Sequence, residues 1–340
     1  MTDPALPGPV LVMGAGSIGC FLGGSLQAAG ARVSYVGRPR VLADLRLNGL
    51  TLTDLDGGRV QLPPAALDLH EQVPIGTAPA LVLLCVKSGA TAEAARELGA
   101  TLPAGTLVLS MQNGISNAEV ARAAAPTLRV LPGMVPYNVA EIGPGCFHRG
   151  TAGALALQDD PALDAWKPVF TAAGLAMTRH DDLRPIQWGK LLLNLNNPVN
   201  ALSGLPLRAQ LLDRDYRYCT AALIDEALAV LDVAGIAPAR VAAVGPRRLP
   251  GLLRLPTWIF RLLAKRMLRI DAQARSSMAD DLARGRPTEI DALCGEVVRL
   301  ARSLRTLAPV NVRMVNLINT WPTNPRPLSG PQIRTRLRGR

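Results

Sequence analysis

Aromatic residues are rare in this sequence, with four Phe, four Tyr and four Trp among 340 residues. A hydrophobic core must therefore consist mainly of Leu, Ala and Val side chains. No stretch interleaves basic with aromatic residues, as proteins that stack nucleic-acid bases on aromatic rings do. We therefore expect no nucleic-acid partner, despite a formal net charge of +11.

Cysteine is present, but not in the spacing of a metal site or a disulfide framework. The five residues are odd in number and far apart, at Cys20, Cys85, Cys146, Cys219 and Cys294. No CxxC motif and no Cys/His cluster occurs, which argues against structural zinc. We expect free thiols in a reducing cytoplasm. No cluster of carboxylates stands out either, so we expect no metal ion.

Long hydrophobic runs are also missing, because no apolar stretch reaches the ~18 residues that span a bilayer. The first residues, MTDPALPGP, lack the basic segment of a secretory signal. In residues 257–270, Arg261, Lys265 and Arg269 are four apart opposite an apolar face. A helix of this kind could lie on an anionic membrane. We favour a helix that packs on its own protein with the basic face in water, and we expect no membrane partner.

The residues that are present, 49% hydrophobic and 19% charged, suit a compact protein of two domains. Strand-like and helix-like patterns alternate in the first half, and helical patterns dominate from about residue 184. The sequence predicts an α/β, Rossmann-type dinucleotide-binding domain over residues 1–183 and an all-α domain over 184–322. Residues 323–340 contain Pro, Gly, Ser and five arginines without periodicity, which predicts a basic, mobile tail.

A glycine motif follows the first predicted strand. Residues 10–19 read VLVMGAGSIG, with Gly14, Gly16 and Gly19 in the spacing GxGxxG, followed by a helical pattern and a second strand. In that context Gly14 permits a tight turn, Gly16 lets the backbone approach a pyrophosphate, and Gly19 lets the helix pack on the sheet. The helix N-terminus then offers N–H groups to the phosphate. The alternative is a glycine-rich turn without a ligand.

The segment after the second strand indicates which dinucleotide is bound. Residues 32–40 read RVSYVGRPR and contain no acid that could bind the ribose hydroxyls of NAD. Arg38 and Arg40 would instead suit a 2′-phosphate, although they could also be ordinary surface arginines. We favour NADP(H) as the cofactor.

Two further predicted strands end in polar residues. Residues 80–88, ALVLLCVKS, end in Lys87 and Ser88, and residues 107–114, LVLSMQNG, end in Asn113 and a glycine. Ligands of open α/β sheets bind beyond the carboxyl ends of the strands. Lys87 and Asn113 are therefore candidates for contacts with nicotinamide and substrate. The alternatives are a solvated lysine and an Asn-Gly turn.

Residues 187–200, QWGKLLLNLNNPVN, place polar side chains at helical spacing within an apolar run. Lys190 and Asn194 are four apart, and Asn197 is seven from the lysine, so one helix would carry all three on one face. The stripe is either surface or the lining of a cleft between the two domains.

Nearer the C-terminus, Ser277 begins a helical segment. Thr288 then resembles the N-cap of the following helix, which places Glu289 in the first turn of that helix. An acid there could serve only the helix dipole.

The motifs together resemble those of the ketopantoate reductase (2-dehydropantoate 2-reductase) family. They run in order over about residues 9–318 as GAGSIG, VGR, VKS, QNG, WGKLLLN, NNP, SSMADDLARGRPTEID and PVN. The resemblance implies a Rossmann domain joined to an all-α domain. It also implies NADPH-dependent reduction of a 2-oxo acid to a 2-hydroxy acid, here 2-dehydropantoate to pantoate in pantothenate biosynthesis.

The resemblance also implies roles for single residues. The family's catalytic lysine falls on Lys190 and its partner glutamate on Glu289. Substrate contacts fall on Asn194, Ser277 and Lys87. Pro198 stands where the family has a second asparagine, which leaves Asn197 as the candidate for that role. Cofactor contacts fall on Gly14, Ala15, Gly16, Ser17, Ile18, Gly19, Arg38, Lys87, Asn113 and Glu289.

The predicted reaction needs a proton donor for the ketone oxygen as hydride reaches its carbon. Lys190 can give that proton, and Glu289 can hold the ammonium in place. Two alternatives remain open: reduction of another 2-oxo acid or an imine, and a protein that senses NADPH without turnover. A homodimer is possible.

Overall fold

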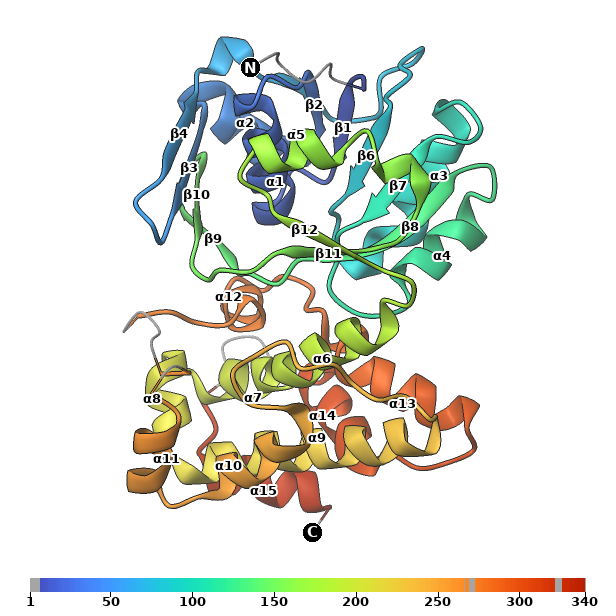
Figure 1. Ribbon diagram of the computed structural model, residues 1–340. Coiled ribbons are helices and arrows are strands. Elements are labelled where there is room, and N and C mark those ends of the chain that lie inside the picture. The colour runs from blue at the N-terminus through green and yellow to red at the C-terminus, as the bar shows by residue number, and fades with distance from the viewer. Residues whose placement is uncertain (1–6, 266, 269–272, 322–325, 340) are drawn as a thin grey trace. The chain divides into compact units, whose positions relative to one another are not determined.

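The computed structural model describes residues 7–265, 267–268, 273–321 and 326–339. The chain divides into two compact units, Met1–Leu183 and Arg184–Arg340. The first is an α/β unit and the second is helical (Figure 1). The predicted fold class is therefore confirmed.

An eight-stranded sheet forms the centre of the first unit, in the order β12-β11-β8-β7-β6-β1-β2-β5. Neighbouring strands are parallel except for the antiparallel pair β8 and β11. The strands are β1 (Val10–Met13), β2 (Val33–Val36), β5 (Asp68–His70), β6 (Leu81–Leu84), β7 (Leu107–Ser110), β8 (Arg129–Met134), β11 (Leu155–Gln158) and β12 (Met177–His180). The strand order reverses at β1, which pairs with β2 on one side and β6 on the other. A reversal of this kind creates a ligand crevice beyond the strand ends.

Helices cover both faces of this sheet, so its central strands are buried throughout. The helices and short turns of the first unit are α1 (Ser17–Ala28), α2 (Pro39–Asn48), η1 (Pro64–Ala66), η2 (Ser88–Ala90), α3 (Thr91–Thr101), α4 (Asn117–Ala124), η3 (Pro161–Leu163) and α5 (Lys167–Ala172). Val10 and Val12 of β1 belong to the core that contains α1, whereas Leu11 and Met13 belong to the core that contains α3 and α4. The alternation of side chains along a strand thus supplies two cores.

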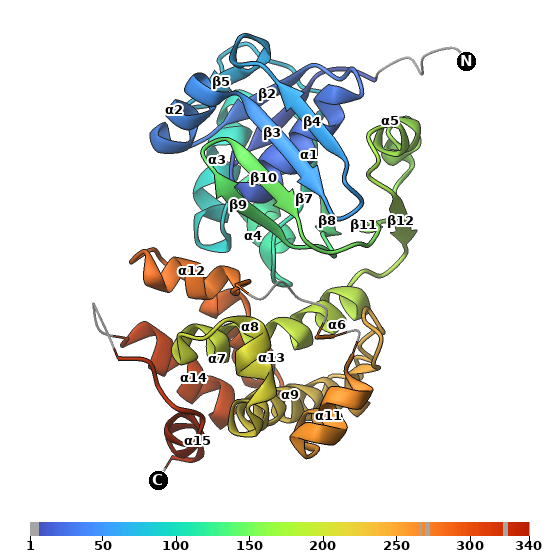
Figure 2. The same ribbon diagram turned by 90° about the vertical axis from the view of Figure 1, so that its left-hand side faces the viewer.

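A second sheet of four strands packs on α1, in the order β4-β3-β10-β9 (Figure 2). Its strands are β3 (Leu50–Asp54), β4 (Arg59–Leu62), β9 (Val139–Gly143) and β10 (Cys146–Arg149). Two consecutive glycines of α1 make the close packing possible. A Cβ on Gly23 would lie 2.7 Å from the Tyr35 ring, and a Cβ on Gly24 would lie 2.7 Å from a Leu50 methyl group. The helix that follows the glycine motif is therefore held between two sheets.

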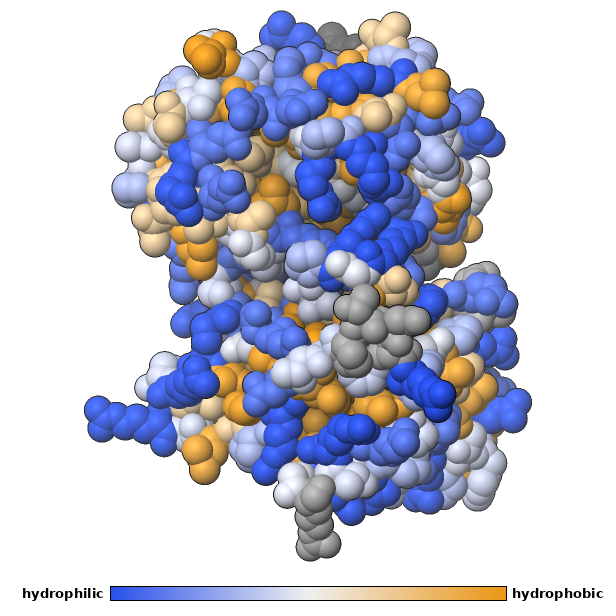
Figure 3. Space-filling model, turned by 180° about the vertical axis from the view of Figure 1, so that it is seen from behind, coloured by the Kyte–Doolittle hydropathy of each residue, from blue (hydrophilic) through white to orange (hydrophobic). Residues whose placement is uncertain are grey.

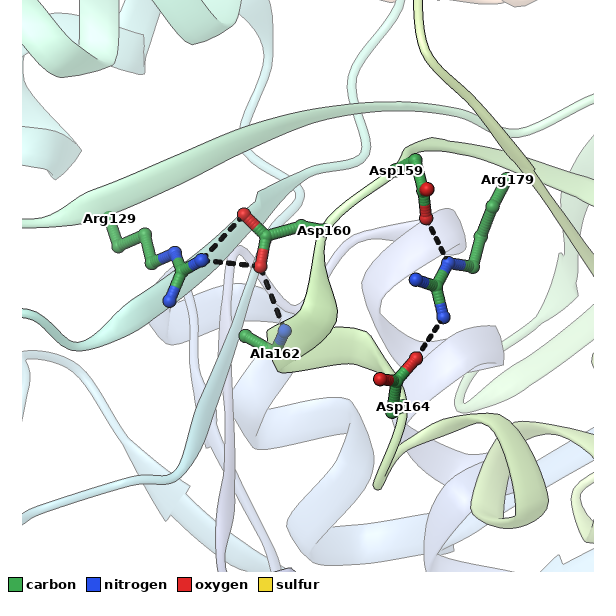
Figure 4. A network of polar contacts seen from close by, with 6 residues as sticks. All are labelled: Arg129, Asp159, Asp160, Ala162, Asp164 and Arg179. Carbon is green, nitrogen blue, oxygen red and sulfur yellow. Dashed lines mark hydrogen bonds and ion pairs between the residues drawn. The ribbon is translucent and has the colours of Figure 1, made fainter.

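Arginine–aspartate pairs fasten the far edge of the large sheet (Figure 4). Arg129 of β8 donates to both carboxylate oxygens of Asp160, at 2.5 and 2.7 Å, and Asp160 also accepts from the N–H of Ala162 at 2.8 Å. Arg179 of β12 pairs with Asp159 and Asp164. Burial raises the pKa of Asp160, but the Ala162 and Arg129 hydrogen bonds outweigh it and hold that pKa below its ordinary value. The carboxylate therefore stays ionised as a structural group.

The second unit packs around a long helix, α9 (Arg214–Val233), which contacts most of the others. Its remaining elements are α6 (Arg184–Asn194), α7 (Asn196–Ser203), α8 (Leu207–Leu212), η4 (Pro246–Arg248), α10 (Leu249–Arg254), α11 (Thr257–Leu263), α12 (Ser277–Ala283), η5 (Ile290–Ala292), α13 (Cys294–Ser303), α14 (Pro309–Asn319) and α15 (Gly330–Arg338). The prediction that one helix carries residues 187–200 is wrong, because α6 ends at Asn194 and α7 begins at Asn196. Pro198 has no N–H to donate to the carbonyl of Asn194, so the helix cannot continue unbroken.

The predicted mobile tail is also wrong over Gly330–Arg338, which forms α15 and packs on α9. Ser329 and Gln332 form a capping box at its start. Ile333 and Leu337 are fully buried. These two apolar residues are one helical turn apart among the arginines, and that spacing is the amphipathic signal that the sequence analysis missed.

Residues 257–270 were expected to form a helix that packs on its own protein, and this expectation is only partly met. Helix α11 buries Phe260, and Ala264 just beyond it is also buried, but Trp258, Leu262 and Leu263 are exposed. A helix this short buries one narrow stripe, and the other apolar side chains remain outside. Residues 266 and 269–272 lie outside the described residues.

Across the described part of the chain, no helix is both long and apolar enough to cross a membrane. The same residues contain no group of three or more His, Cys, Asp or Glu side chains placed to hold a metal ion. All five cysteines are free thiols.

Candidate functional site

The turn from β1 into α1 requires glycine at one position in the loop and at one in the first turn of the helix. Gly14 has φ +109°, and a Cβ there would lie 2.6 Å from the backbone nitrogen of Val86. A Cβ on Gly19 would lie 2.1 Å from the carbonyl oxygen of Gly14. The loop thus turns sharply and α1 approaches it closely, as the sequence pattern predicts.

Gly16 occupies the N-cap of α1 and leaves space where a phosphate would bind. It is exposed, and no atom lies within 4 Å of the position that its Cβ would take. No side chain caps the helix at this position, and its first turn contains no acid. The N–H groups that start α1 at Ser17 and Ile18 therefore point from the positive end of a helix dipole. These features fit a dinucleotide pyrophosphate.

Arg38 lies next to this loop. The N–H groups of Gly14 and Ala15 both donate to the carbonyl of Val36, at 2.9 Å, so the end of β2 adjoins the glycine loop. Arg38 follows two residues later and is exposed. Arg40, by contrast, pairs with Asp44 at 3.2 Å and with Glu141 at 3.5 Å. Arg38 forms no ion pair within the described residues, which distinguishes it from Arg40 as an anion ligand.

Lys87 and Asn113 follow the carboxyl ends of the adjacent parallel strands β6 and β7. Both are half-buried. Ser88, next to the lysine, donates its hydroxyl to the carbonyl of Asn113 at 3.1 Å. The two segments are thus tied together, although they are 25 residues apart.

A buried polar network beneath these segments was missed by the sequence analysis. Gln112 donates to the carbonyl of Val86 at 2.9 Å and to the hydroxyl of Thr91 at 2.7 Å. The Thr91 hydroxyl donates to Asn117 at 3.0 Å, and Asn117 donates to the carbonyl of Asn113 at 2.5 Å. Thr91 and Asn117 are the first residues of α3 and α4. The sequence does contain a signal for this network, because a polar residue stands at the start of each of the two helices that follow a strand.

Lys190 and Glu289 form the charged part of the second unit's candidate site. Lys190 is half-buried on α6. Burial of the ammonium lowers its pKa from 10.5 to about 8, and the carboxylate of Glu289 acts in the opposite direction. The fold therefore brings residues 99 positions apart within electrostatic range. An ammonium with a pKa this close to neutrality can release and regain its proton in a catalytic cycle.

Glu289 does not lie where the sequence predicted. Thr288 is not an N-cap; Glu289 itself precedes the three-residue turn η5, and α13 begins only at Cys294. The Glu289 side chain makes no capping hydrogen bond. The view that this acid serves only a helix dipole therefore loses its structural basis.

Asn194 and Ser277 differ in their surroundings. Asn194 is half-buried, one turn from Lys190 on α6, and Ser277 is exposed at the start of α12. The neighbouring Ser276 is buried and structural: its N–H donates to Asn200 at 2.9 Å, and its hydroxyl donates to the carbonyl of Asn197 at 3.3 Å. Ser276 and Asn200, which the sequence analysis did not identify, thus fix α12 on α7. The Asn197 side chain belongs to α7 and not to the helix of Lys190.

Comparison with known proteins identifies a family for both units. The family model described as ketopantoate reductase PanE/ApbA matches residues 10–161, and that of its C-terminal region matches residues 182–321. A 2-dehydropantoate 2-reductase of Halobacterium salinarum is 30% identical over 318 residues, covering 91% of this chain and 97% of the relative.

Solved structures agree with this assignment. A PanE/ApbA family ketopantoate reductase from Ralstonia eutropha is 29% identical with a TM-score of 0.76, over 92% of this chain and 97% of its own. D-mandelate dehydrogenase, solved with NADH and anilino(oxo)acetate, shares the fold at 18% identity and a TM-score of 0.75, over the same shares of the two chains. This chain belongs to the ketopantoate reductase family and is an oxidoreductase of the dinucleotide-binding kind.

Proposed function

We propose that the protein reduces the ketone of 2-dehydropantoate to the hydroxyl of pantoate, with NADPH as the hydride donor. The observation that carries the proposal is the desolvated ammonium of Lys190, with its pKa of about 8 and its carboxylate partner Glu289. Reduction of a ketone needs both a hydride and a proton, and this pair is suited to supply the proton.

The first unit supplies the groups that would hold the cofactor. NADPH, when bound, supplies the hydride that the reaction consumes. The glycine loop from Gly14 to Gly19, with Ala15, Ser17 and Ile18, would bind its pyrophosphate through backbone N–H groups. Arg38 would bind the 2′-phosphate by a charge-assisted hydrogen bond. Asn113, Lys87 and Glu289 would complete the contacts with the nicotinamide half.

Lys190 is assigned the role of general acid. Its ammonium would hydrogen-bond the ketone oxygen, stabilise negative charge on that oxygen and then give it a proton. Glu289 would keep the ammonium oriented and charged, because burial alone favours the neutral amine. After turnover the amine would regain a proton from water.

Four side chains are assigned to substrate binding, three of them new and the fourth, Lys87, shared with the cofactor. Asn194, Asn197 and Ser277 would orient the substrate through neutral hydrogen bonds. Lys87 would attract its carboxylate by charge.

Two alternative functions need the same cofactor groups. One is a reductase of another 2-oxo acid or an imine, and the other is a sensor of NADPH without turnover. Free thiols at all five cysteines support a reducing compartment, which we propose is the cytoplasm.

The test is a panel of 2-oxo acids and cyclic imines in which oxidation of NADPH is followed by absorbance. We expect kcat/KM for 2-dehydropantoate to exceed that of every other compound by about tenfold or more, as a side chain that fits its pocket can provide. A higher value for another compound would reassign the substrate. Tight NADPH binding with no oxidation by any compound would favour a sensor.

Replacement of Arg38 tests the choice of cofactor. Arg38→Ala should raise KM for NADPH about 10-fold to 100-fold, because it removes a charged hydrogen bond to the 2′-phosphate. The values for NADH should change little, since NADH has no such phosphate. Arg40→Ala is the matched control, because Arg40 is already paired with Asp44 and Glu141. Equal losses with both cofactors in Arg38→Ala would remove Arg38 from 2′-phosphate recognition.

A further inference from the structure

The net positive charge of the protein comes from the second unit. Residues Arg184–Arg340 contain 25 basic and 11 acidic residues, whereas Met1–Leu183 contains 12 and 15. The formal charges are thus +14 and −3, which together give the +11 of the whole chain. Within the second unit, residues 233–270 contain eight basic residues and no acidic one. This stretch therefore carries charge of one sign only, as residues 297–340 also do, with nine basic residues and no acidic one.

Helix α11 adds exposed apolar surface to this basic segment. The exposed fractions are 72% for Trp258, 58% for Leu262 and 61% for Leu263. On the face of the molecule seen in Figure 3, hydrophobic and hydrophilic residues are interspersed, as is usual for a protein surface. Helix α11 differs from this mixed surface, because three large exposed apolar side chains lie within six residues. A cluster of this kind indicates a surface that binds a partner.

The exposure follows from how the helix is held. Arg217 of α9 is completely buried, and its guanidinium lies 4.3 Å from the centre of the Phe260 ring. It also donates to the carbonyls of Leu253 and Leu255, each at 2.9 Å. One buried guanidinium therefore both holds the α10–α11 turn and contacts the Phe260 ring on the inward side of α11. The opposite side of α11 is turned outward by the packing and not by local fraying.

The outward side combines apolar and cationic groups. Trp258 and Leu262 are four residues apart on α11, with Arg261 beside Leu262, and Lys265 follows just after the end of the helix. Arg261 and Lys265 are exposed, and neither forms an ion pair with any described residue. Tryptophan with flanking cations is the composition of segments that rest at the boundary between lipid and water.

We infer that α11, with Trp258, Arg261, Leu262 and Leu263, and the adjoining Lys265 form a peripheral docking surface for an anionic lipid bilayer. Arg247 and Arg254 are paired with Asp232 and Asp225, but Arg261 and Lys265 remain to complement anionic headgroups. The headgroup region also accommodates the indole and leucine side chains. A second copy would instead bring two strongly positive units together, which is unfavourable. Seven residues rise only about 10 Å, so the helix would lie on the bilayer and not cross it. The inference does not depend on the reductase activity.

Sedimentation with lipid vesicles tests this inference. The full chain is mixed with vesicles of phosphatidylcholine alone or with phosphatidylglycerol added, at low and high salt. We expect binding only to the anionic vesicles, and a loss of it at high salt. The double variants Trp258→Gln/Leu262→Gln and Arg261→Glu/Lys265→Glu should each lower the partition coefficient about tenfold or more.

The matched controls are Leu307→Gln, which alters a leucine that is 83% exposed elsewhere, and Arg302→Glu, which reverses an exposed charge on α13. Both should bind vesicles as the wild type does, and circular dichroism should show all variants folded. Equal binding to neutral vesicles, no binding at all, or equal losses in the controls would overturn the inference. So would a wild-type dimer that ignores vesicles and becomes a monomer in Trp258→Gln/Leu262→Gln, because the surface would then join two copies.

Discussion

Replacement of Lys190 by alanine is expected to lower kcat for 2-dehydropantoate about 10³-fold while the Kd of NADPH changes about twofold or less. The change removes both the proton donor and the positive charge beside the ketone oxygen. Lys190→Arg keeps a charge but provides no group that titrates near neutrality, so it should recover only a small part of the activity. Steady-state kinetics and a separate NADPH titration measure the two effects. Wild-type turnover in Lys190→Ala would exclude the proposed role.

The pH dependence provides a signature that a purely structural lysine would not give. Reduction needs the protonated ammonium, whose pKa burial lowers to about 8. The rate of reduction should therefore be constant at lower pH and fall as the pH rises through about 8. Glu289 acts to raise that pKa, so Glu289→Gln should move the falling limb to lower pH. An unchanged limb in Glu289→Gln would mean that the pair does not act as proposed.

Gly19→Ala is expected to have the largest effect on stability in the first unit. The added Cβ would lie 2.1 Å from the carbonyl oxygen of Gly14, which belongs to the backbone and cannot rotate away. The helix and loop would have to separate, at a cost of about 3 kcal/mol in the free energy of unfolding, and NADPH binding should be lost. Chemical denaturation and an NADPH titration measure the two losses.

Gly16→Ala is the matched control for this variant. No atom lies within 4 Å of its Cβ position, and its φ of −93° suits any residue. Stability should change by about 0.5 kcal/mol or less, while NADPH binding weakens because the methyl group occupies the approach of the phosphate. If Gly19→Ala proved as stable as Gly16→Ala, the close helix–strand contact would not be needed for folding.

The parts of the fold that sequence analysis predicted depend on local patterns. The buried runs of β1 and β6 and the spacing of Gly14, Gly16 and Gly19 belong to single short segments. So do the polar residues that follow β6 and β7. Each of these features depends on residues within a few positions of one another in the sequence, and over that range propensity and periodicity are informative.

The parts that it did not predict depend on contacts between distant segments. The break between α6 and α7 is an exception, because Pro198 is a local signal that the sequence analysis did not use. The burial of Ile333 and Leu337 requires α9, and the outward side of α11 requires Arg217. The coupling of Lys190 with Glu289 came from family resemblance alone, because no spacing relates residues 99 positions apart.

The network of Gln112, Thr91 and Asn117 has a consequence for redesign of the enzyme. The Gln112 amide joins the carbonyl of Val86 to the start of α3, and Ser88 donates to the carbonyl of Asn113, so the loops that present Lys87 and Asn113 are held by one connected network. Libraries that vary either loop to admit a bulkier 2-oxo acid should keep Gln112 constant. A replacement there would disturb both loops at once, and a gain in substrate range would be concealed by a loss of order.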